Sequence, residues 1–503
     1  MNLPLIFILI LAVLVRFFYF PDNVYFAYDQ ARDSFTALEI LKGDFKVVGP
    51  PSFASDKLFP GPLIFYIYAP IYFLFEKNPE AVSALLRVYN AFGVILIFWI
   101  GSVLFNKKID LIAAFLFAVS YEQSQYSLFI SHQPLAVIGV LLFYFGASRL
   151  IFKKDKRGLI ISALGLGLSM QSHYLYIFLI PFSLLLTVVF RKNIFPLKAK
   201  YTYLALATFF ITVSTFIVSE VKFGFRFTSG ILSQLLAVAS PDKKTSFYPE
   251  SGIFVINRII HDNFLANYGL TSAVAVVFAA VAIFFLRNKN LRSKMVFLGI
   301  WLFGGIVPYL LSGATSYYYS AAASASLVLL TSWVVYQLFL KNKILAVLLL
   351  LGIAANNLYL ISNFNDRGPN RDIVIQPGML VRDQKKVIDY IYSKAEGEPF
   401  AVNGLTIPLA VNTTWSYLFE WYGQKTYHSL PVWGGEAAGG FAGNLKIVSA
   451  RDKLPKKQFL IIEPMIGINQ YDSDNFFRIE GYFTKVIEEQ KFGTIIVQQR
   501  EKI

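Results

Sequence analysis

Long apolar runs recur along the first two thirds of the chain, and they constrain its fold more than any other feature. Runs of about 17 or more residues rich in Leu, Ile, Phe and Val continue to residue 362. Of the 503 residues, 56% are hydrophobic and only 15% are charged, whereas a soluble domain carries about 25% charged residues. The sequence therefore predicts a polytopic α-helical membrane protein. It contains no cysteine, which excludes disulfides, thiol catalysis and cysteine-bound metals.

Five short loops between the apolar runs are strongly basic. They hold sixteen Lys and Arg residues, and Asp110 and Asp155 are the acids nearby. The positive-inside rule puts such loops in the cytoplasm. All five reach that side only if the apolar run Phe59–Phe75, which contains three prolines, does not cross the membrane. Because proline breaks a regular helix, we expect this run to lie along the outer interface.

The remaining runs predict eleven spans, with the amino terminus inside. Leu3–Phe20 is the first, and we expect it to be an uncleaved helix rather than a signal peptide, because Arg16 interrupts it and no small-residue cleavage site follows. The others are expected near 82–105, 109–121, 132–151, 158–172, 173–190, 202–220, 268–286, 295–311, 319–340 and 344–362. This topology predicts a multi-pass plasma-membrane protein with an outer first loop, 21–81.

The tail from residue 363 differs in composition. Residues 1–362 hold 29 Lys/Arg against 15 Asp/Glu, whereas 363–503 hold 17 against 16. The basic excess thus follows the loop topology and does not indicate a nucleic-acid partner. A helix is expected at Asp383–Lys394 and strands at Pro399–Val402, Phe459–Ile462 and Thr494–Gln498. We therefore expect a transmembrane domain at 1–362 and a small α/β extracytoplasmic domain at 363–503.

Two carboxylates follow the first span at a helical spacing. Asp29 and Asp33 would lie one turn apart on one helix face, with Arg32 beside them. Acids this close to a bilayer are costly unless they have a function. Most single acids in outer loops are simply solvated, but this pair sits in an aromatic setting and precedes a Gly/Pro-rich apolar run. We interpret the pair as the chemical centre of the chain.

Other polar residues on the predicted outer side are candidates for binding an anionic substrate. The cations are Arg32, Lys57, Arg226, Lys243, Lys244 and Arg258, although most such charges only face solvent or headgroups. The corner Gln171-Ser-His173-Tyr174 is a further candidate, with a structural hydrogen-bonding role as the alternative. No P-loop, Rossmann glycine pattern or HExxH motif occurs, which argues against a nucleotide-driven pump or a zinc protease.

The order of these features resembles the GT-C glycosyltransferases, in particular the aminoarabinose transferases that act on lipid A and the protein O-mannosyltransferases. The resemblance covers roughly residues 1–360. It rests on the acid motif after the first span and on four short motifs: Gly49-Pro50-Pro51, Gly61-Pro-Leu-Ile-Phe-Tyr66, the Gln171–Tyr174 corner and Ser316-Tyr-Tyr318-Tyr319. It implies a glycosyltransferase that uses a polyprenyl-phosphate sugar donor and a lipid, glycan or protein acceptor at the membrane lipid surface.

The resemblance also implies roles for residues. Asp29 matches the first-loop acid that serves as general base or acceptor ligand, with Asp33 as a second catalytic acid. The family pattern there is Asp-Glu, and because Gln30 replaces the Glu, its role moves to Asp33 or is absent. In the second outer turn, Glu122 or His132 would stand for a further family acid, so dependence on a divalent metal stays open. Substrate-binding candidates are Arg32, Lys57, Glu122, His132, Gln171, His173, Arg258 and Tyr318.

Three other functions remain open from the sequence. A transporter or flippase of lipid-linked sugars would need polar residues along a path through the bilayer, whereas here they gather at the outer edge. A polymerase or ligase of lipid-linked glycans would use closely related chemistry. A non-catalytic membrane scaffold would not depend on Asp29 for activity. The sugar, the acceptor and the oligomeric state are not indicated by the sequence.

Overall fold

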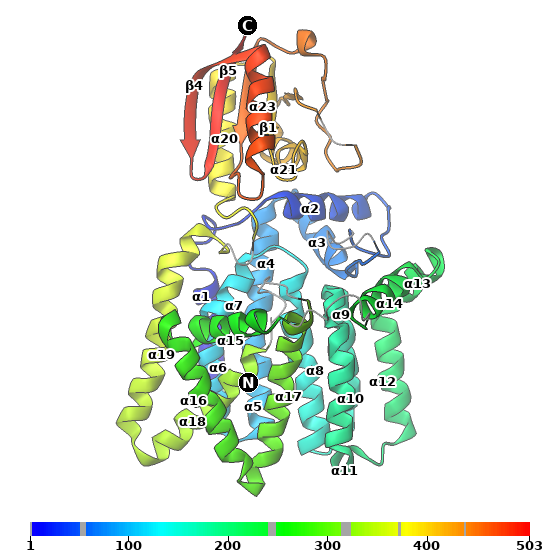
Figure 1. Ribbon diagram of the computed structural model, residues 1–503, viewed down its shortest axis with the longest axis vertical. Coiled ribbons are helices and arrows are strands. Elements are labelled where there is room, and N and C mark those ends of the chain that lie inside the picture. The colour runs from blue at the N-terminus through cyan, green and yellow to red at the C-terminus, as the bar shows by residue number, and fades with distance from the viewer. Residues whose placement is uncertain (1–2, 51–56, 240–247, 313–322, 371–373, 437–438) are drawn as a thin grey trace.

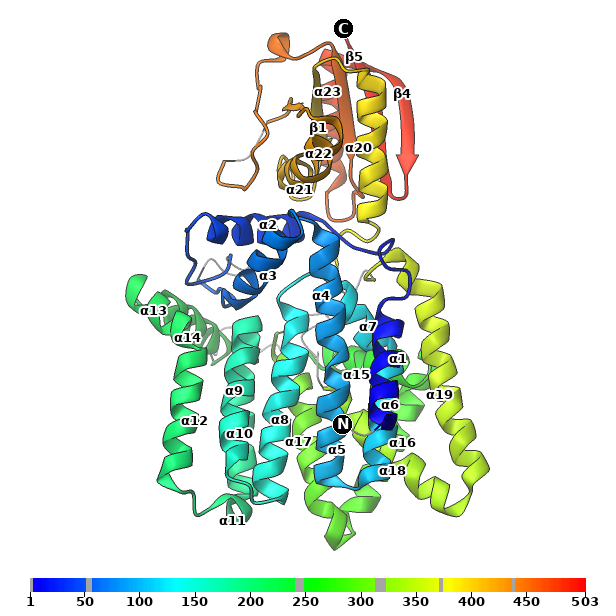
Figure 2. The same ribbon diagram turned by 180° about the vertical axis from the view of Figure 1, so that it is seen from behind.

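The computed structural model describes residues 3–50, 57–239, 248–312, 323–370, 374–436 and 439–503. A bundle of long helices forms the lower part of the molecule, two short helices lie across one end of the bundle, and an α/β unit stands above them (Figures 1 and 2). The C-terminus lies at the far end of the α/β unit (Figure 1). The chain thus has three layers along its longest axis.

Most of the long helices in the bundle have an apolar composition that suits a bilayer. Its α-helices are α1 (Leu3–Arg16), α4 (Pro79–Ala91), α5 (Gly93–Leu104), α6 (Lys107–Val119), α7 (Tyr121–Leu128), α8 (Ala136–Phe152), α9 (Arg157–Ser172), α10 (Leu179–Val189), α11 (Arg191–Ile194), α12 (Ala199–Thr212), α13 (Ser214–Lys222), α14 (Arg226–Ala239), α15 (Pro249–Asn263), α16 (Tyr268–Leu286), α17 (Lys289–Ser312), α18 (Ser324–Lys341) and α19 (Lys343–Phe364). The 3₁₀ turns η1 (Gln133–Leu135), η2 (Tyr174–Phe178) and η4 (Asn365–Arg367) join some of them.

Fewer helices than eleven are long enough to cross a membrane without a break. By length and composition, five helices of the described residues qualify, or up to seven if two bent pairs each count as one span. The pairs are α12 with α13, bent by 57°, and α15 with α16, bent by 98°. Three shorter apolar helices were also found: Leu3–Arg16, Leu63–Leu74 and Tyr174–Val189. The eleven-span topology therefore stays a prediction.

Two fully buried arginines link the first helices of the bundle. The Arg16 side chain donates from Nε to Asn90 Oδ1 at 2.8 Å, and Arg87 donates from Nη1 to the Arg16 carbonyl at 2.7 Å. Arg87 Nη2 also donates to Asn23 Oδ1 at 2.9 Å, and Asn23 donates to the Asn365 carbonyl at 2.8 Å. Buried charges need such hydrogen bonds. The network fixes the point at which the chain leaves α1 for the acid motif.

The two short helices, α2 (Tyr28–Leu41) and α3 (Leu63–Leu74), lie side by side across the end of the bundle (Figures 1 and 2). With 12 residues, α3 is shorter than the roughly 20 residues that a crossing needs. The hydroxyls of Ser34 on α2 and Tyr72 on α3 share a hydrogen bond of 2.6 Å. The helix within Phe59–Phe75 thus supports the acid-bearing α2, and its place at the outer interface remains a prediction.

The α/β unit contains a five-stranded sheet of order β2-β1-β3-β5-β4. β1 pairs in parallel with β2 and β3, whereas β5 pairs antiparallel with β3 and β4. The elements are α20 (Val381–Ala395), β1 (Phe400–Leu405), α21 (Thr413–Leu418), the π-helical turn η5 (Phe419–Gly423), α22 (Gln424–Tyr427), β2 (Val432–Trp433), η6 (Arg451–Lys453), β3 (Lys457–Ile462), α23 (Gln470–Phe483), β4 (Thr484–Phe492) and β5 (Ile495–Lys502). The predicted helix and three predicted strands correspond to α20, β1, β3 and β5.

The α/β unit is joined to the segment that precedes Asp29 by backbone hydrogen bonds. Phe26 N donates to the Met379 carbonyl, and Val381 N donates to the Val24 carbonyl, both at 2.9 Å. Tyr417 of α21 donates its hydroxyl to the Lys77 carbonyl at 2.6 Å, just after α3. The α/β unit therefore rests directly on the layer formed by α2 and α3.

Candidate functional site

The centre of the site is a charge cluster on the first turns of α2. Arg32 donates to Asp33 Oδ1 from Nε at 2.9 Å and from Nη2 at 2.7 Å. Its Nη1 lies 2.8 Å from Asp29 Oδ1. A helix brings residues three and four apart together, so one guanidinium lies between both carboxylates. The helical spacing predicted from the sequence is confirmed.

The two carboxylates differ in exposure and in pairing. The Asp29 side chain is 43% exposed, whereas that of Asp33 is 2% exposed. Burial raises the pKa of Asp33, but the charge of Arg32, with a further contribution from the nearby His132, outweighs burial and holds that pKa below its ordinary value. Asp33 is therefore a buried anion that fixes Arg32, while Asp29 is the carboxylate that a substrate can reach.

Gln30 fixes α2 to the turn that carries His132. Its Oε1 accepts a hydrogen bond from Ala27 N at 3.2 Å, and its Nε2 donates to the Ile130 carbonyl at 2.7 Å. An amide can do both at once because it contains an acceptor and a donor, which a carboxylate cannot. The residue that departs from the family's Asp-Glu pattern thus has a structural role here.

Two histidines complete one side of the site. His132 Nδ1 lies 3.9 Å from Asp33 Oδ2, and the His132 and His173 rings stack in parallel with their centroids 5.7 Å apart. His173 Nδ1 accepts a hydrogen bond from Leu175 N at 3.2 Å, so the neutral ring carries its proton on Nε2. The structure therefore brings α2, the η1 turn and the corner between α9 and η2 together.

Several buried polar atoms of this cluster have no hydrogen-bond partner. They are Asp33 Oδ2, His132 Nδ1 and, at the α9 corner, Gln171 Oε1, whereas Asp29 Oδ1 lies 2.8 Å from Arg32 Nη1. Gln171 is held by its Nε2, which donates to the Thr212 carbonyl at 2.8 Å. Buried polar groups are normally satisfied, and unpaired ones that gather at one place are typical of a site that binds a polar ligand.

The remaining predicted residues lie elsewhere or outside the described residues. Glu122 is buried and accepts a hydrogen bond from Asn263 at 2.9 Å. Arg258 pairs with Asp262 at 2.8 Å and donates to the Tyr268 hydroxyl at 2.6 Å. Both therefore belong to a cluster of α7, α15 and α16.

Two of the predicted cations lie near α14. Lys57 is exposed beside Gly230 of α14, and the Arg226 guanidinium lies 5.7 Å from the centre of the Phe59 ring. Tyr318, Lys243 and Lys244 lie outside the described residues.

The arrangement of the acids around Arg32 does not suit a divalent metal ion. Arg32 fills the space between the two carboxylates and pairs with both. Across the described part of the chain, no group of three or more His, Asp and Glu side chains could hold a metal ion. Because metal sites need several converging ligands, the described residues do not form one.

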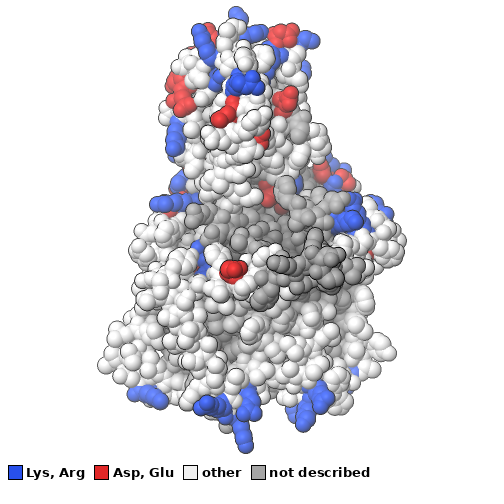
Figure 3. All heavy atoms as spheres, in the orientation of Figure 1, with Lys and Arg blue, Asp and Glu red and all other residues white. Residues whose placement is uncertain are grey.

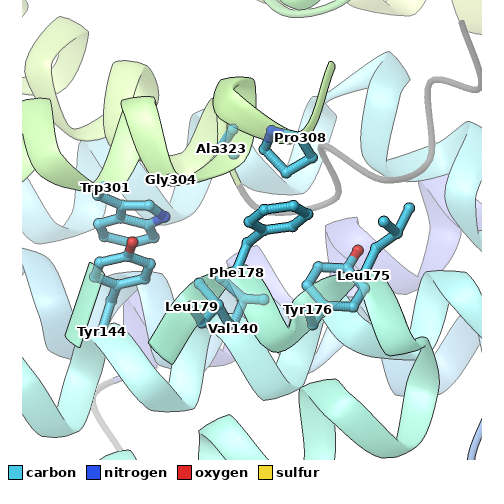
Figure 4. A pocket seen from close by; sticks show the side chains of 11 residues that line it. Val140, Tyr144, Leu175, Tyr176, Phe178, Leu179, Trp301, Gly304, Pro308 and Ala323 are labelled. Carbon is cyan, nitrogen blue, oxygen red and sulfur yellow. The ribbon is translucent and has the colours of Figure 1, made fainter. Parts of the chain in front are cut away.

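A small apolar cavity lies beside η2, the turn that follows the histidine corner. It has about 20 Å³ of accessible volume and is bordered by α8, η2 and α17, with Leu175 and Tyr176 on its wall. Figure 4 shows the Tyr144 ring lying against Trp301 at one end of it; their centroids are 4.2 Å apart. Its lining is apolar, so it favours contact with apolar groups.

Comparisons with known proteins agree with this architecture. Residues 60–218 match the family model for dolichyl-phosphate-mannose-protein mannosyltransferases. No curated protein matches the sequence. Among solved structures, ArnT from Cupriavidus metallidurans bound to undecaprenyl phosphate has a TM-score of 0.62 at 12% identity, over 98% of this chain and 97% of ArnT. ArnT in the apo state has a TM-score of 0.63 at 11% identity over the same shares.

A third solved structure is more distant. The Archaeoglobus fulgidus oligosaccharyltransferase in complex with Zn and sulfate has a TM-score of 0.50 at 13% identity, over 97% of this chain and 72% of that protein. The family match begins after the acid motif, so it does not include Asp29 or Asp33. The chain has the fold of ArnT over nearly its whole length and is similar to the mannosyltransferases over residues 60–218, which confirms its resemblance to the GT-C membrane glycosyltransferases.

Proposed function

We propose that the protein transfers a sugar from a polyprenyl-phosphate donor to an acceptor on the outer face of the plasma membrane, with Asp29 as the general base. The observation that carries this proposal is the cluster of Asp29, Arg32, Asp33 and His132, in which buried polar atoms lack hydrogen-bond partners. The likeness to ArnT in fold supports the same class of chemistry.

The difference between the two carboxylates supports separate roles. Asp29 is partly exposed and is held by a single contact to Arg32. Asp33 is buried and takes two hydrogen bonds from the same guanidinium. A general base must reach the proton that it removes, which only Asp29 can do. Asp33 is then a positioning residue that keeps Arg32 in place.

The proposed reaction is an inverting displacement at the sugar C1. As Asp29 takes the proton, the acceptor oxygen forms a bond to C1, and the C1–O bond to the phosphate breaks with both electrons leaving on the phosphate. Fixed cations stabilise this departing anion. Arg32, Lys57 and Arg226 are the proposed contributors. Because Arg32 already pairs with two acids, we propose that the more exposed Lys57 and Arg226 supply the remaining positive charge.

The lipid part of the donor and the acceptor would contact different parts of the protein. The apolar side chains that line the small cavity beside η2 are suited to contact with the isoprene units of a carrier lipid (Figure 4). ArnT was solved with undecaprenyl phosphate bound, which supports a lipid-phosphate carrier here. The α/β unit at 363–503, which we propose is extracytoplasmic, stands above α2 and would border the acceptor. The acceptor class stays open among lipid, glycan and protein.

The test is transfer from a radiolabelled polyprenyl-phosphate sugar pool to endogenous acceptor in membranes. Loss of a positioned general base costs about 10²–10⁴ in rate, so Asp29→Asn is expected to lose transfer by that factor. Asp33→Asn is expected to lose less. Asp22→Asn, which removes an exposed acid from the same loop, serves as the matched control and keeps normal transfer. Near-normal transfer by the Asp29→Asn/Asp33→Asn double variant would overturn the proposal.

A further inference from the structure

A second apolar groove lies in the bundle near α11, at the end opposite the acid cluster. Its accessible volume is about 340 Å³, near the lower end of the range for ligand sites. Its walls come from α8, α9, α10 and α12, and Ile194 of α11 borders it. Figure 1 shows α11 at the bottom of the bundle, on the side away from α2 and the α/β unit. The groove is therefore separate from the proposed active site.

The groove surface is suited to a hydrocarbon chain. Leu, Ile, Phe and Ala side chains dominate its lining, and its polar members are hydroxyls. Three of these donate to helix carbonyls: Ser162 to Phe143 at 3.0 Å, Ser183 to Ile180 at 2.7 Å, and Thr187 to Ser183 at 2.9 Å. Because their donors are already satisfied within the helices, these hydroxyls require no polar ligand. The walls favour an apolar occupant.

The end of the groove is closed by two hydrogen bonds. Lys156 Nζ donates to the Ile194 carbonyl at 2.5 Å, and Asn193 Nδ2 donates to the Ile151 carbonyl at 3.2 Å. They join the loop between α8 and α9 to α11. The groove is thus bounded by the short basic connection between α10 and α12.

That connection carries unbalanced positive charge. Arg191, Lys192, Lys198 and Lys200 are all exposed. None of the four forms an ion pair with an acid in the described ranges. Lys and Arg side chains gather along this end of the molecule on the face that Figure 3 shows. An apolar groove with a cationic rim is complementary to a lipid with an anionic headgroup.

We propose that this groove binds one acyl chain of an anionic phospholipid, with its phosphate on the basic connection around Lys192 and Lys198. A carrier lipid is the less suitable occupant, because a phosphate at this rim would hold its sugar at the opposite end of the bundle from Asp29 (Figure 1). The bound phospholipid would fill the space between α10 and α12. It would thereby brace α12, whose Thr212 carbonyl holds Gln171.

The test is native mass spectrometry of the full-length protein in detergent. Phosphatidylglycerol and phosphatidylcholine with identical acyl chains are added at equal concentration. The wild type is expected to retain one phosphatidylglycerol in preference to phosphatidylcholine. Lys192→Gln and Lys198→Gln should each reduce that preference about fivefold. Lys341→Gln/Lys343→Gln removes two exposed lysines between α18 and α19 at the same end, and as the control it should leave the preference unchanged.

A second pair of variants fills the groove itself. Ala205→Phe and Thr202→Phe, made separately, should each reduce binding of both lipids, because the added ring occupies the space of the chain. If neither variant yields monodisperse protein, the exposed lysine variants still decide the question. Equal retention of the two phospholipids by the wild type, an unchanged preference in the lysine variants, or retention of polyprenyl phosphate in their place would each overturn the proposal.

Discussion

At the scale of residues, two buried carboxylates show how the charge of the group that contacts an acid sets the pKa of that acid. Asp33 faces the guanidinium of Arg32, and that full positive charge outweighs burial and lowers its pKa. Glu463, just after β3, accepts hydrogen bonds from the Gln376 side chain, Ile407 N and Trp415 Nε1. These donors are neutral, so burial dominates and raises the pKa of Glu463 to about 7.

Glu463 should make the stability of the α/β unit depend on pH, and the raised pKa fixes the direction of that dependence. Its carboxyl releases its proton near pH 4.5 in the unfolded chain and near 7 in the folded one. The folded state therefore holds the extra proton between these values, and the free energy of unfolding falls by roughly 3 kcal/mol as pH rises through them. Melting temperatures measured from about pH 5 to about pH 8 should fall for the wild type and fall less for Glu463→Gln. An equal slope for both would contradict this assignment.

Some site residues could be predicted from the sequence because they are close along the chain. Asp29, Arg32 and Asp33 belong to one helix, so helical spacing alone brings them together. His132 is predicted from the resemblance and His173 from its polar corner with Gln171 and Tyr174, but the stacking of their rings is a tertiary contact that no spacing indicates. The contacts of Ser34 on α2 with Tyr72 of α3, and of Tyr72 with Tyr417 of α21, are not predicted, because isolated hydroxyl and ring residues give no signal in an aromatic-rich chain.

At the scale of elements, glycines set the distance between α8 and α9. A Cβ added at Gly146 would lie 2.4 Å from Ser162 N, and one at Gly165 would lie 2.2 Å from Phe143 N. Small residues allow helix backbones in membranes to approach closely. This contact positions the α9 corner, with Gln171 and His173, beside the η1 turn.

Valine at these glycines should separate the two helices. Gly146→Val is expected to lower the yield of folded protein and its melting temperature, because the backbone of α9 cannot move away without disrupting the corner. Gly352→Val on α19 is the matched control, since a Cβ there meets nothing within 4 Å. Thermal unfolding of both variants in detergent measures the difference. A Gly146→Val variant as stable as the control would show that the close contact is not required.

The sequence predicted elements well where their pattern was apolar and poorly where it was not. The run expected at 82–105 forms α4 and α5, which together make one candidate span, Pro79–Leu104, and β1, β3 and β5 lie at the expected strands. The strand β4 was missed because it is an edge strand with charged, exposed residues along most of its length. The two bent helix pairs are also not predicted, since hydropathy indicates how long an apolar run is but not where the helix within it bends.

At the scale of the whole molecule, the direction in which the chain sits in the membrane can be measured directly. The chain contains no cysteine, so a single introduced cysteine reports its own side. Lys154→Cys, in the loop between α8 and α9, should react with an impermeant maleimide only from the cytoplasm. Ser429→Cys, in the α/β unit, should react only from outside. Both positions are exposed. Labelling of position 154 from outside would reverse the topology and put the acid cluster on the cytoplasmic face.

The central proposal is that a lipid-linked sugar reacts at the acid cluster of Asp29, Arg32 and Asp33. The most direct measurement is mass spectrometry of the lipids that copurify with the Asp29→Asn variant. Because this variant keeps Arg32, Asp33 and the apolar cavity but lacks the base, it should retain an intact polyprenyl-phosphate sugar. The Arg32→Ala variant should retain much less of it. A folded Asp29→Asn protein without any lipid-linked sugar, or with the same amount as Arg32→Ala, would contradict the account.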